Sequence, residues 1–201
     1  YDLLISGGRV FDGAGNPWFV GDVGIRGDTI VYVGASRDEA ARLRLDAKNL
    51  AVAPGFLDTH SHSRRSIFEE PTAATLIMQG VTTVIEGPDG SSPLPLRPYL
   101  AKLAATPIGV NFGMLVGQGS IREAVIGLKD RQATPEEIVK MKALARQAML
   151  DGAFGISTGL FYLPGIFTPT GEVIELAKVV GQMGGLHTSH MRDEAAGIIS
   201  S

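Results

Sequence analysis

Two histidines separated by one residue are the side chains of this sequence best suited to chemistry. They end the segment Pro54-Gly-Phe-Leu-Asp-Thr-His-Ser-His62. Residues two apart in a β-strand point to the same face, so Asp58, His60 and His62 share a face if this segment is a strand. Two imidazoles on one face can hold one metal ion, and their nitrogens suit zinc. The same spacing also fits two polar residues in a strand-to-loop turn.

Two carboxylates follow a second apolar run. Glu86 and Asp89 lie in Thr82-Thr-Val-Ile-Glu-Gly-Pro-Asp-Gly90. Either carboxylate could bind or bridge metal ions, because carboxylate oxygens are zinc ligands. The alternative is ordinary turn chemistry, since Pro-Asp-Gly is a favoured turn sequence.

The remaining histidines lie in a third run, Gly185-Leu-His-Thr-Ser-His-Met-Arg-Asp-Glu194. His187 and His190 have opposite parity, so a regular strand turns only one of them toward a site at its end. All four histidines of the chain lie in this run and in the first one. Their concentration favours a functional role over isolated core histidines.

A fourth segment is rich in Gly, Ser and Thr and contains Tyr162. It runs from Gly152 to Gly165 and breaks a strand-like run. Its hydroxyls and backbone amides could seat a substrate, or it could form a rigid turn with a packing aromatic ring.

The amino-acid composition limits the classes of protein in which such a site could occur. The chain has 201 residues, of which 44% are hydrophobic and 19% charged, as is typical of folded proteins. Its net charge of −3 does not favour a nucleic-acid or anionic membrane surface. The absence of cysteine excludes a disulfide scaffold, a thiolate zinc site and a catalytic cysteine. No segment is typical of a membrane span or a signal peptide, so we expect a cytoplasmic protein without membrane or nucleic-acid partners.

Two regions differ in their pattern. Residues 1–52 consist of short apolar runs broken by Gly, Asp and Asn, which predicts a small β module with a hairpin turn at Arg26-Gly-Asp28. From residue 53, apolar runs alternate with helix-like segments. The predicted strands are 54–60, 81–86, 108–116, 153–157 and 185–190. The predicted helices lie near 71–79, 95–105, 135–150 and 171–183.

The helix near 135–150 carries the clearest signals. Thr134 and Glu137 form a capping-box pattern around Pro135, and Gly152 lies just past the expected end. One apolar face is expected along it, made of Ile138, Met141, Leu144, Ala145 and Met149.

Alternation of strands and helices predicts a parallel sheet with crossover helices. Five such strands make either an open doubly wound sheet or the front part of a (β/α)8 barrel, which needs eight. The polar motifs at the strand ends favour the barrel, whose active sites lie at that rim. We therefore expect an α/β fold: the first five βα units of a TIM-like barrel over residues 53–201, preceded by part of a β-sandwich over residues 1–52.

Together these motifs resemble the N-acyl-D-amino-acid deacylase (D-aminoacylase) family of the amidohydrolase superfamily. The resemblance follows essentially the whole chain in order. Its pieces are Asp2-Leu-Leu-Ile-Ser-Gly-Gly-Arg-Val-Phe-Asp-Gly13, the His60–His62 motif, Gln79-Gly-Val-Thr-Thr-Val84, Gly155-Ile-Ser-Thr-Gly159, Tyr162-Leu-Pro-Gly165 and Thr188-Ser-His-Met-Arg-Asp-Glu194.

The resemblance implies a barrel hydrolase that uses one or two zinc ions. It implies that His60 and His62 bind one metal position and that His190 binds another, tighter one. Many family members place a metal-binding cysteine in the turn after the second strand, where this sequence has Asp89. Glu86 is a second candidate for that ligand.

The implied reaction is hydrolysis of the amide bond of N-acyl-D-amino acids, which releases a carboxylate and a D-amino acid. Tyr162 matches a position near the substrate. By the resemblance, a general-base aspartate and a further histidine ligand are expected beyond Ser201, in the remaining part of the barrel. The chain by itself is therefore expected to be inactive.

Two other functions stay open. One is a cyclic-amide amidohydrolase of the hydantoinase or dihydroorotase kind, which commonly bridges its metals with a carboxylated lysine. None of the five predicted strands contains lysine, which favours the deacylase. The other is a truncated barrel that binds metal without catalysis.

Overall fold

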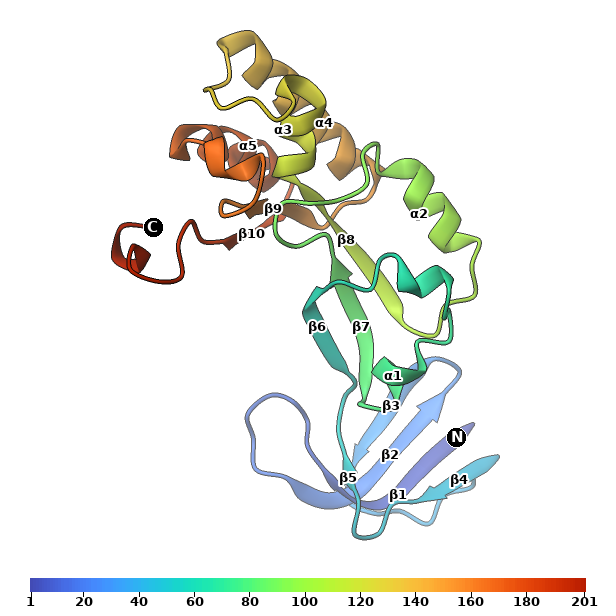
Figure 1. Ribbon diagram of the computed structural model, residues 1–201. Helices are drawn as coiled ribbons and strands as arrows, with labels where there is room; N and C mark the ends of the chain where they lie inside the picture. Colours follow the sequence, from blue (N-terminus) through green and yellow to red (C-terminus); the bar gives the residue numbers. More distant parts are fainter. The chain divides into compact units, whose positions relative to one another are not determined.

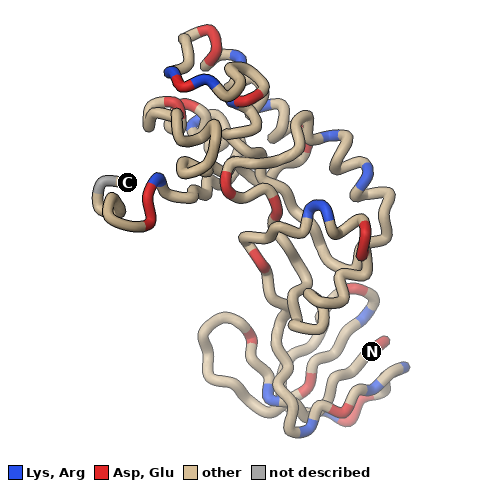
Figure 2. Tube along the Cα trace, in the orientation of Figure 1, with Lys and Arg blue, Asp and Glu red and all other residues tan. Residues whose placement is uncertain are grey.

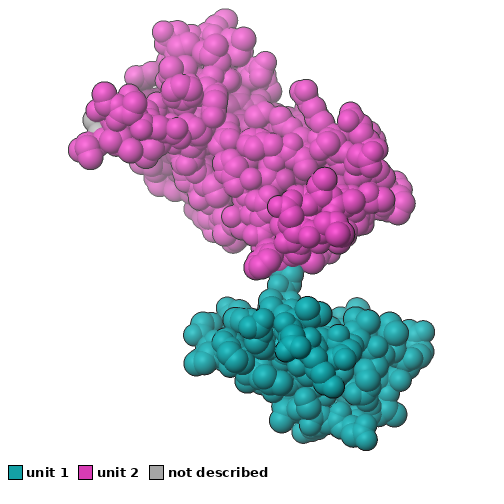
Figure 3. Space-filling model, turned by 60° about the horizontal axis from the view of Figure 1, so that its bottom comes forward, with its two compact units in different colours: residues 1–55 teal, residues 56–201 magenta. Residues whose placement is uncertain are grey.

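The chain forms two compact units, shown in different colours in Figure 3. The computed structural model describes residues 1–201, apart from the side chain of Ser200. The first unit comprises Tyr1–Gly55 and the second Phe56–Ser201.

The first unit is a single mixed sheet. Its strands are β1 (Leu3–Val10), β2 (Phe19–Arg26), β3 (Thr29–Gly34), β4 (Leu43–Asp46) and β5 (Ala51–Val52). The order is β3-β2-β1-β4, with β5 also paired to β1. Gly27 turns β2 into β3 with a φ of 60°, which confirms the predicted hairpin. The expected piece of a β-sandwich is therefore present as one layer.

The second unit contains one parallel sheet (Figure 1), and its strands follow chain order, β6-β7-β8-β9-β10. The strands are β6 (Phe56–Ser61), β7 (Val81–Glu86), β8 (Asn111–Gly117), β9 (Gly155–Gly159) and β10 (Leu186–His190). Five consecutive parallel strands joined by helical crossovers form part of a TIM-like barrel, as expected.

Helices connect these strands. They are α1 (Ala74–Ile77), α2 (Arg97–Ala104), α3 (Gln118–Ile126), α4 (Pro135–Asp151) and α5 (Thr170–Gln182), with short 3₁₀ helices at Ser66–Phe68, Gly165–Phe167 and Ile198–Ser200. The capping box of α4 is formed by Thr134 and Glu137, as predicted, and Gly152 ends this helix in the left-handed conformation.

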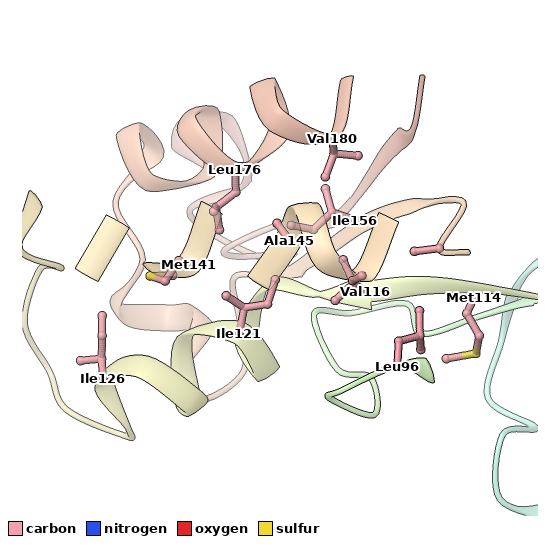
Figure 4. Packing of buried hydrophobic residues seen from close by; sticks show 12 residues of the cluster. Leu96, Met114, Val116, Ile121, Ile126, Met141, Ala145, Ile156, Leu176 and Val180 are labelled. Atoms are coloured by element: carbon pink, nitrogen blue, oxygen red, sulfur yellow. The ribbon is translucent and has the colours of Figure 1, made fainter. Parts of the chain in front are cut away.

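The main hydrophobic core brings together side chains of β8 and β9 and of the helices α3, α4 and α5 (Figure 4). Met141 and Ala145 of the predicted α4 face are fully buried, and Ile138, Leu144 and Met149 pack against this core. Side chains of β8 and β9 are packed in this core. In a parallel sheet the C-terminal ends of all strands lie at the same edge, so the loops that follow them meet there. The site is built at that end.

Two elements differ from the sequence prediction. Helix α1 is much shorter than residues 71–79, because Ala73 has a φ of 49° and the α-helix begins only after it. Helix α3 was not predicted, because its buried face includes Gln118 and Arg122 and so lacks apolar periodicity. Arg122 instead pairs with a buried carboxylate, since its Nη1 lies 2.5 Å from Glu172 Oε2.

Basic and acidic residues are interspersed along the chain trace (Figure 2). Among the described residues, no helix is both long and apolar enough to cross a membrane.

Candidate metal centre

Strand β6 delivers the two histidines of the first motif. His60 lies near its end and His62 just after it, and their ring centroids are 5.2 Å apart. Each Nε2 atom lies 3.3 Å from the same oxygen, Oδ2 of Asp89. Asp58 shares the strand but has another partner, since its carboxylate accepts the His60 backbone N–H at 3.1 Å.

The turn after β7 places Asp89 opposite these rings. Gly87, Asp89 and Gly90 all have left-handed φ angles, of 81°, 56° and 75°. A side chain at Gly87 would collide with the Leu115 carbonyl oxygen, so this position requires glycine. Aspartate is among the few other residues that tolerate such an angle. The turn thus fixes the carboxylate through its backbone.

Ser157 of β9 supports this turn from the neighbouring part of the sheet. Its buried hydroxyl donates to the Gly87 carbonyl at 2.5 Å and accepts the Gly90 backbone N–H at 3.0 Å. The hydroxyl group therefore anchors both sides of Asp89. The sequence left two roles open for the segment around Ser157, a substrate seat or a rigid turn, and this serine holds the neighbouring turn.

The three side chains form a donor group that fits a metal ion. Among the described residues, His60, His62 and Asp89 offer ligand atoms within 4.8 Å of one another. Ligands at about 2.0–2.1 Å from a tetrahedral ion lie about 3.3 Å apart, and both nitrogen–oxygen separations are 3.3 Å. The histidine side chains are 59% and 67% exposed, so the group is open to further ligands, as catalytic zinc sites are.

His190 reaches the same rim but is not part of this donor group. Its Nε2 lies 3.2 Å from Glu194 Oε1 and its Nδ1 lies 2.9 Å from the Met191 carbonyl oxygen. His190, His60 and Asp89 line a common hollow of about 320 Å³. The structure therefore places His190 beside the group, with a carboxylate as its partner.

His187 has a different partner from His190. Its Nε2 lies 3.0 Å from Oγ1 of the buried Thr158. Burial of the ring lowers the pKa of His187 below its usual range, which favours the neutral imidazole. His187 is not one of the clustered donors among the described residues.

A larger hollow of about 470 Å³ opens beside the donor group. Tyr162, His62, Asp89 and Arg64 are among its lining residues. The Tyr162 ring lies 4.8 Å from the His190 ring, centroid to centroid, in an edge-on arrangement. The aromatic ring predicted to lie near a substrate therefore borders a space that reaches two of the three donors.

Glu86 is not one of the clustered donors. It is 1% exposed at the end of β7, and its Oε1 accepts hydrogen bonds from the backbone N–H of Ser63 and, at 2.9 Å, from the Ser63 hydroxyl. Of the two candidate carboxylates, the geometry brings Asp89 to the histidines.

Sequence reasoning missed Ser63 and Arg64. Arg64 donates to the carbonyl and hydroxyl oxygens of Ser91 at 2.6 and 3.0 Å, and its own carbonyl accepts from Tyr99. Burial and the nearby charge of Glu86 raise the pKa of Tyr99 to about 12, so its hydroxyl stays protonated as the donor. The polar run after His62 was the only signal, and it does not reveal partners on other elements.

Comparison with models of protein families gives no match. Among curated proteins, the chain is 39% identical to a D-aminoacylase of Alcaligenes xylosoxydans xylosoxydans, covering 100% of this chain and 46% of that protein. It is 36% identical to an N-acyl-D-aspartate deacylase of the same organism, over 98% of this chain and 45% of that protein.

Solved structures give the same result. A D-aminoacylase structure that defines a subset of amidohydrolases matches with a TM-score of 0.92 and 38% identity, over 100% of this chain and 47% of that one. An N-acyl-D-glutamate deacylase of Bordetella bronchiseptica, complexed with zinc and a phosphonate inhibitor, matches with a TM-score of 0.91 and 34% identity, over 99% of this chain and 47% of that one. A further D-aminoacylase structure concerns a binuclear metal centre. The chain spans about half the length of these relatives.

Proposed function

The chain is a homologue, over its whole length, of the D-aminoacylases, a family of amidohydrolases, and we propose that its protein hydrolyses the amide bond of N-acyl-D-amino acids. The observation that carries the proposal is the donor group of His60, His62 and Asp89 at the ends of two adjacent parallel strands.

The donor chemistry supports zinc as the cofactor. Two imidazole nitrogens and one carboxylate oxygen form a common catalytic zinc set, and both nitrogen–oxygen separations are compatible with a tetrahedral ion. Bound zinc would supply Lewis-acid polarisation of the acyl carbonyl and a lowered pKa of water. His190 offers an imidazole for a second ion at the same rim.

The larger hollow is the proposed place of the substrate. Its lining includes Tyr162 and the neighbouring Leu163 and Pro164, together with His62 and Asp89. Tyr162 presents an exposed ring with a hydroxyl, which can pack against the substrate and orient it by one hydrogen bond.

Hydrolysis breaks the acyl carbon–nitrogen bond. Water provides the new oxygen on the acyl carbon and a proton for the departing amine, which leaves as the D-amino acid. A carboxylate must move that proton. Asp89 is engaged with both histidines, so we propose that the general base comes from chain beyond Ser201, which the greater length of the relatives could supply.

The test is substrate hydrolysis by the full-length protein with zinc. We expect release of free amino acid from N-acetyl-D-amino acids and much less from the L-enantiomers. His60→Ala and His62→Ala should abolish release, since each removes a metal donor. His187→Gln is the matched control, because it changes a histidine outside the donor group and should retain activity.

Hydantoins and dihydroorotate are the competing substrates. Hydrolysis of these rings without release from N-acetyl-D-amino acids would overturn the proposal in favour of a cyclic-amide hydrolase. Zinc binding without any hydrolysis would instead indicate a barrel that only binds metal.

A further inference from the structure

A buried carboxylate beside the donor group has no role in the reaction described so far. Glu86 is 1% exposed, and among the described residues its hydrogen bonds are both made by Oε1, to Ser63. Its Oε2 is buried without a hydrogen-bond partner among the described residues. A buried carboxylate costs free energy unless its interactions repay it, so its place at the end of β7 calls for an explanation.

We propose that Glu86 is a positioning residue that fixes the turn carrying His62 and thereby sets the metal affinity of the donor group. This inference rests on the proposed metal site. Ser63 directly follows His62 and supplies both its backbone N–H and its hydroxyl to Glu86. The contact therefore acts on the backbone immediately next to the ligand.

The geometry of the two strands explains why this contact is needed. The pairing of β6 with β7 is irregular between Asp58 and Ser61, so the regular ladder is interrupted in the segment that contains His60. Ser61 is paired in register with Glu86, and its hydroxyl lies 2.9 Å from that of Ser63. Hydrogen bonds among two serines and one carboxylate thus add to the ladder pair at the end of β6, next to the ligands.

The end of β7 also leads directly into the turn that carries the third ligand, Asp89. Glu86 is the last residue of this strand. Glu86 therefore ties the His62 turn to the element that carries Asp89. Partners of this kind orient metal ligands, and their loss typically lowers metal affinity about 10–100-fold.

The test compares three variants of the full-length protein with Co²⁺ as the probe. Glu86→Ala removes both hydrogen bonds, so Co²⁺ affinity should fall about 10–100-fold and the visible absorption spectrum should change. Glu86→Gln keeps an oxygen that can accept from Ser63. It should keep the spectrum and most of the affinity, although its buried amide nitrogen lowers the Tm. Ser63→Ala removes only the hydroxyl donor and should lower the affinity less than Glu86→Ala.

Glu172→Gln is the control for stability. It disrupts a buried pair with Arg122 that does not contact His60, His62 or Asp89, so it should lower the Tm and leave the Co²⁺ spectrum unchanged.

Unchanged Co²⁺ affinity in Glu86→Ala would overturn the proposal. Equal losses in Glu86→Gln and Glu86→Ala would also overturn it, because the charge and not the hydrogen bonds would then matter. If Glu86→Ala does not fold, Ser63→Ala becomes the deciding variant. Unchanged Co²⁺ affinity in Ser63→Ala would then overturn the proposal. Failure of the unmodified protein to bind Co²⁺ would overturn the metal site itself and hence the proposed function.

Discussion

At the scale of single residues, the donor group depends on one carboxylate that the backbone holds in place. Asp89 has a φ of 56° and its side chain is 16% exposed, between two histidine rings that are far more open. The spacing of His60 and His62 was enough to predict their shared face, because strand parity is local. Asp89 could be named only from its place in a resembling motif, since spacing alone did not separate it from Glu86.

The contact between Glu86 and Ser63 could not be predicted from the sequence. The two residues belong to different strands, and their meeting depends on the irregular register between β6 and β7. The sequence of one strand shows which of its residues share a face, but it does not show which residues of another strand they pair with.

The nature of the third donor leads to a prediction about metal choice. Asp89→Ala should weaken zinc binding strongly, because it removes one of the three donors and only the two imidazoles of the group remain. Asp89→Cys should keep a donor but shift the preference from Mn²⁺ toward Zn²⁺, because thiolate is the softer ligand. Competition titrations with both metals measure this ratio.

Asp151→Asn is the control for that titration, since this carboxylate pairs with Arg97 at the end of α4. It should leave both affinities unchanged. Wild-type zinc affinity in Asp89→Ala would contradict the assignment of Asp89 as a ligand.

At the scale of elements, α4 and α3 show what the sequence can and cannot reveal. The caps and apolar face of α4 are contained within its own residues, so its bounds could be predicted almost to the residue. Helix α3 buries Gln118 and Arg122, whose Nε2 and Nη1 atoms donate hydrogen bonds to Thr168 and Glu172 from a later part of the chain. Because polar residues occupy part of its buried face, the sequence of α3 does not show the apolar periodicity that predicts a buried helix.

The capping box of α4 predicts a pH-dependent contribution to stability. Hydrogen bonds from Arg131 and from the Thr134 backbone lower the pKa of Glu137 from 4.5 to about 2. The lowered pKa means that the charged form stabilises the fold above pH 4.5, and that this contribution is lost as the pH falls toward 2. Thermal unfolding of the wild type and Glu137→Gln should therefore differ most near neutral pH and converge toward pH 2.

Thr134→Ala serves as the comparison for this experiment. It removes an uncharged cap and should cost about 1 kcal/mol in the free energy of unfolding, with little dependence on pH over the same range. A difference between wild type and Glu137→Gln that stays constant from pH 7 to pH 2 would contradict this account.

At the scale of the whole molecule, the second unit has the arrangement of part of a barrel. Strands β6 and β10 are the two ends of its sheet, and Phe56, Leu57 and Leu186 on them are 58–65% exposed. Edge strands with exposed apolar residues are typical surfaces for pairing with further strands. The fold class was predictable because strand–helix alternation repeats along the chain. The function was predictable only in outline, because the chain spans about half the length of its relatives.

The central claim is that a metal ion binds between His60, His62 and Asp89, and zinc-edge anomalous diffraction from crystals of the full-length protein tests it most directly. We predict an anomalous peak about 2.0–2.2 Å from one nitrogen of each histidine and from Asp89 Oδ2. Zinc-loaded crystals with no peak between these three side chains would contradict the metal site and the hydrolase function that depends on it.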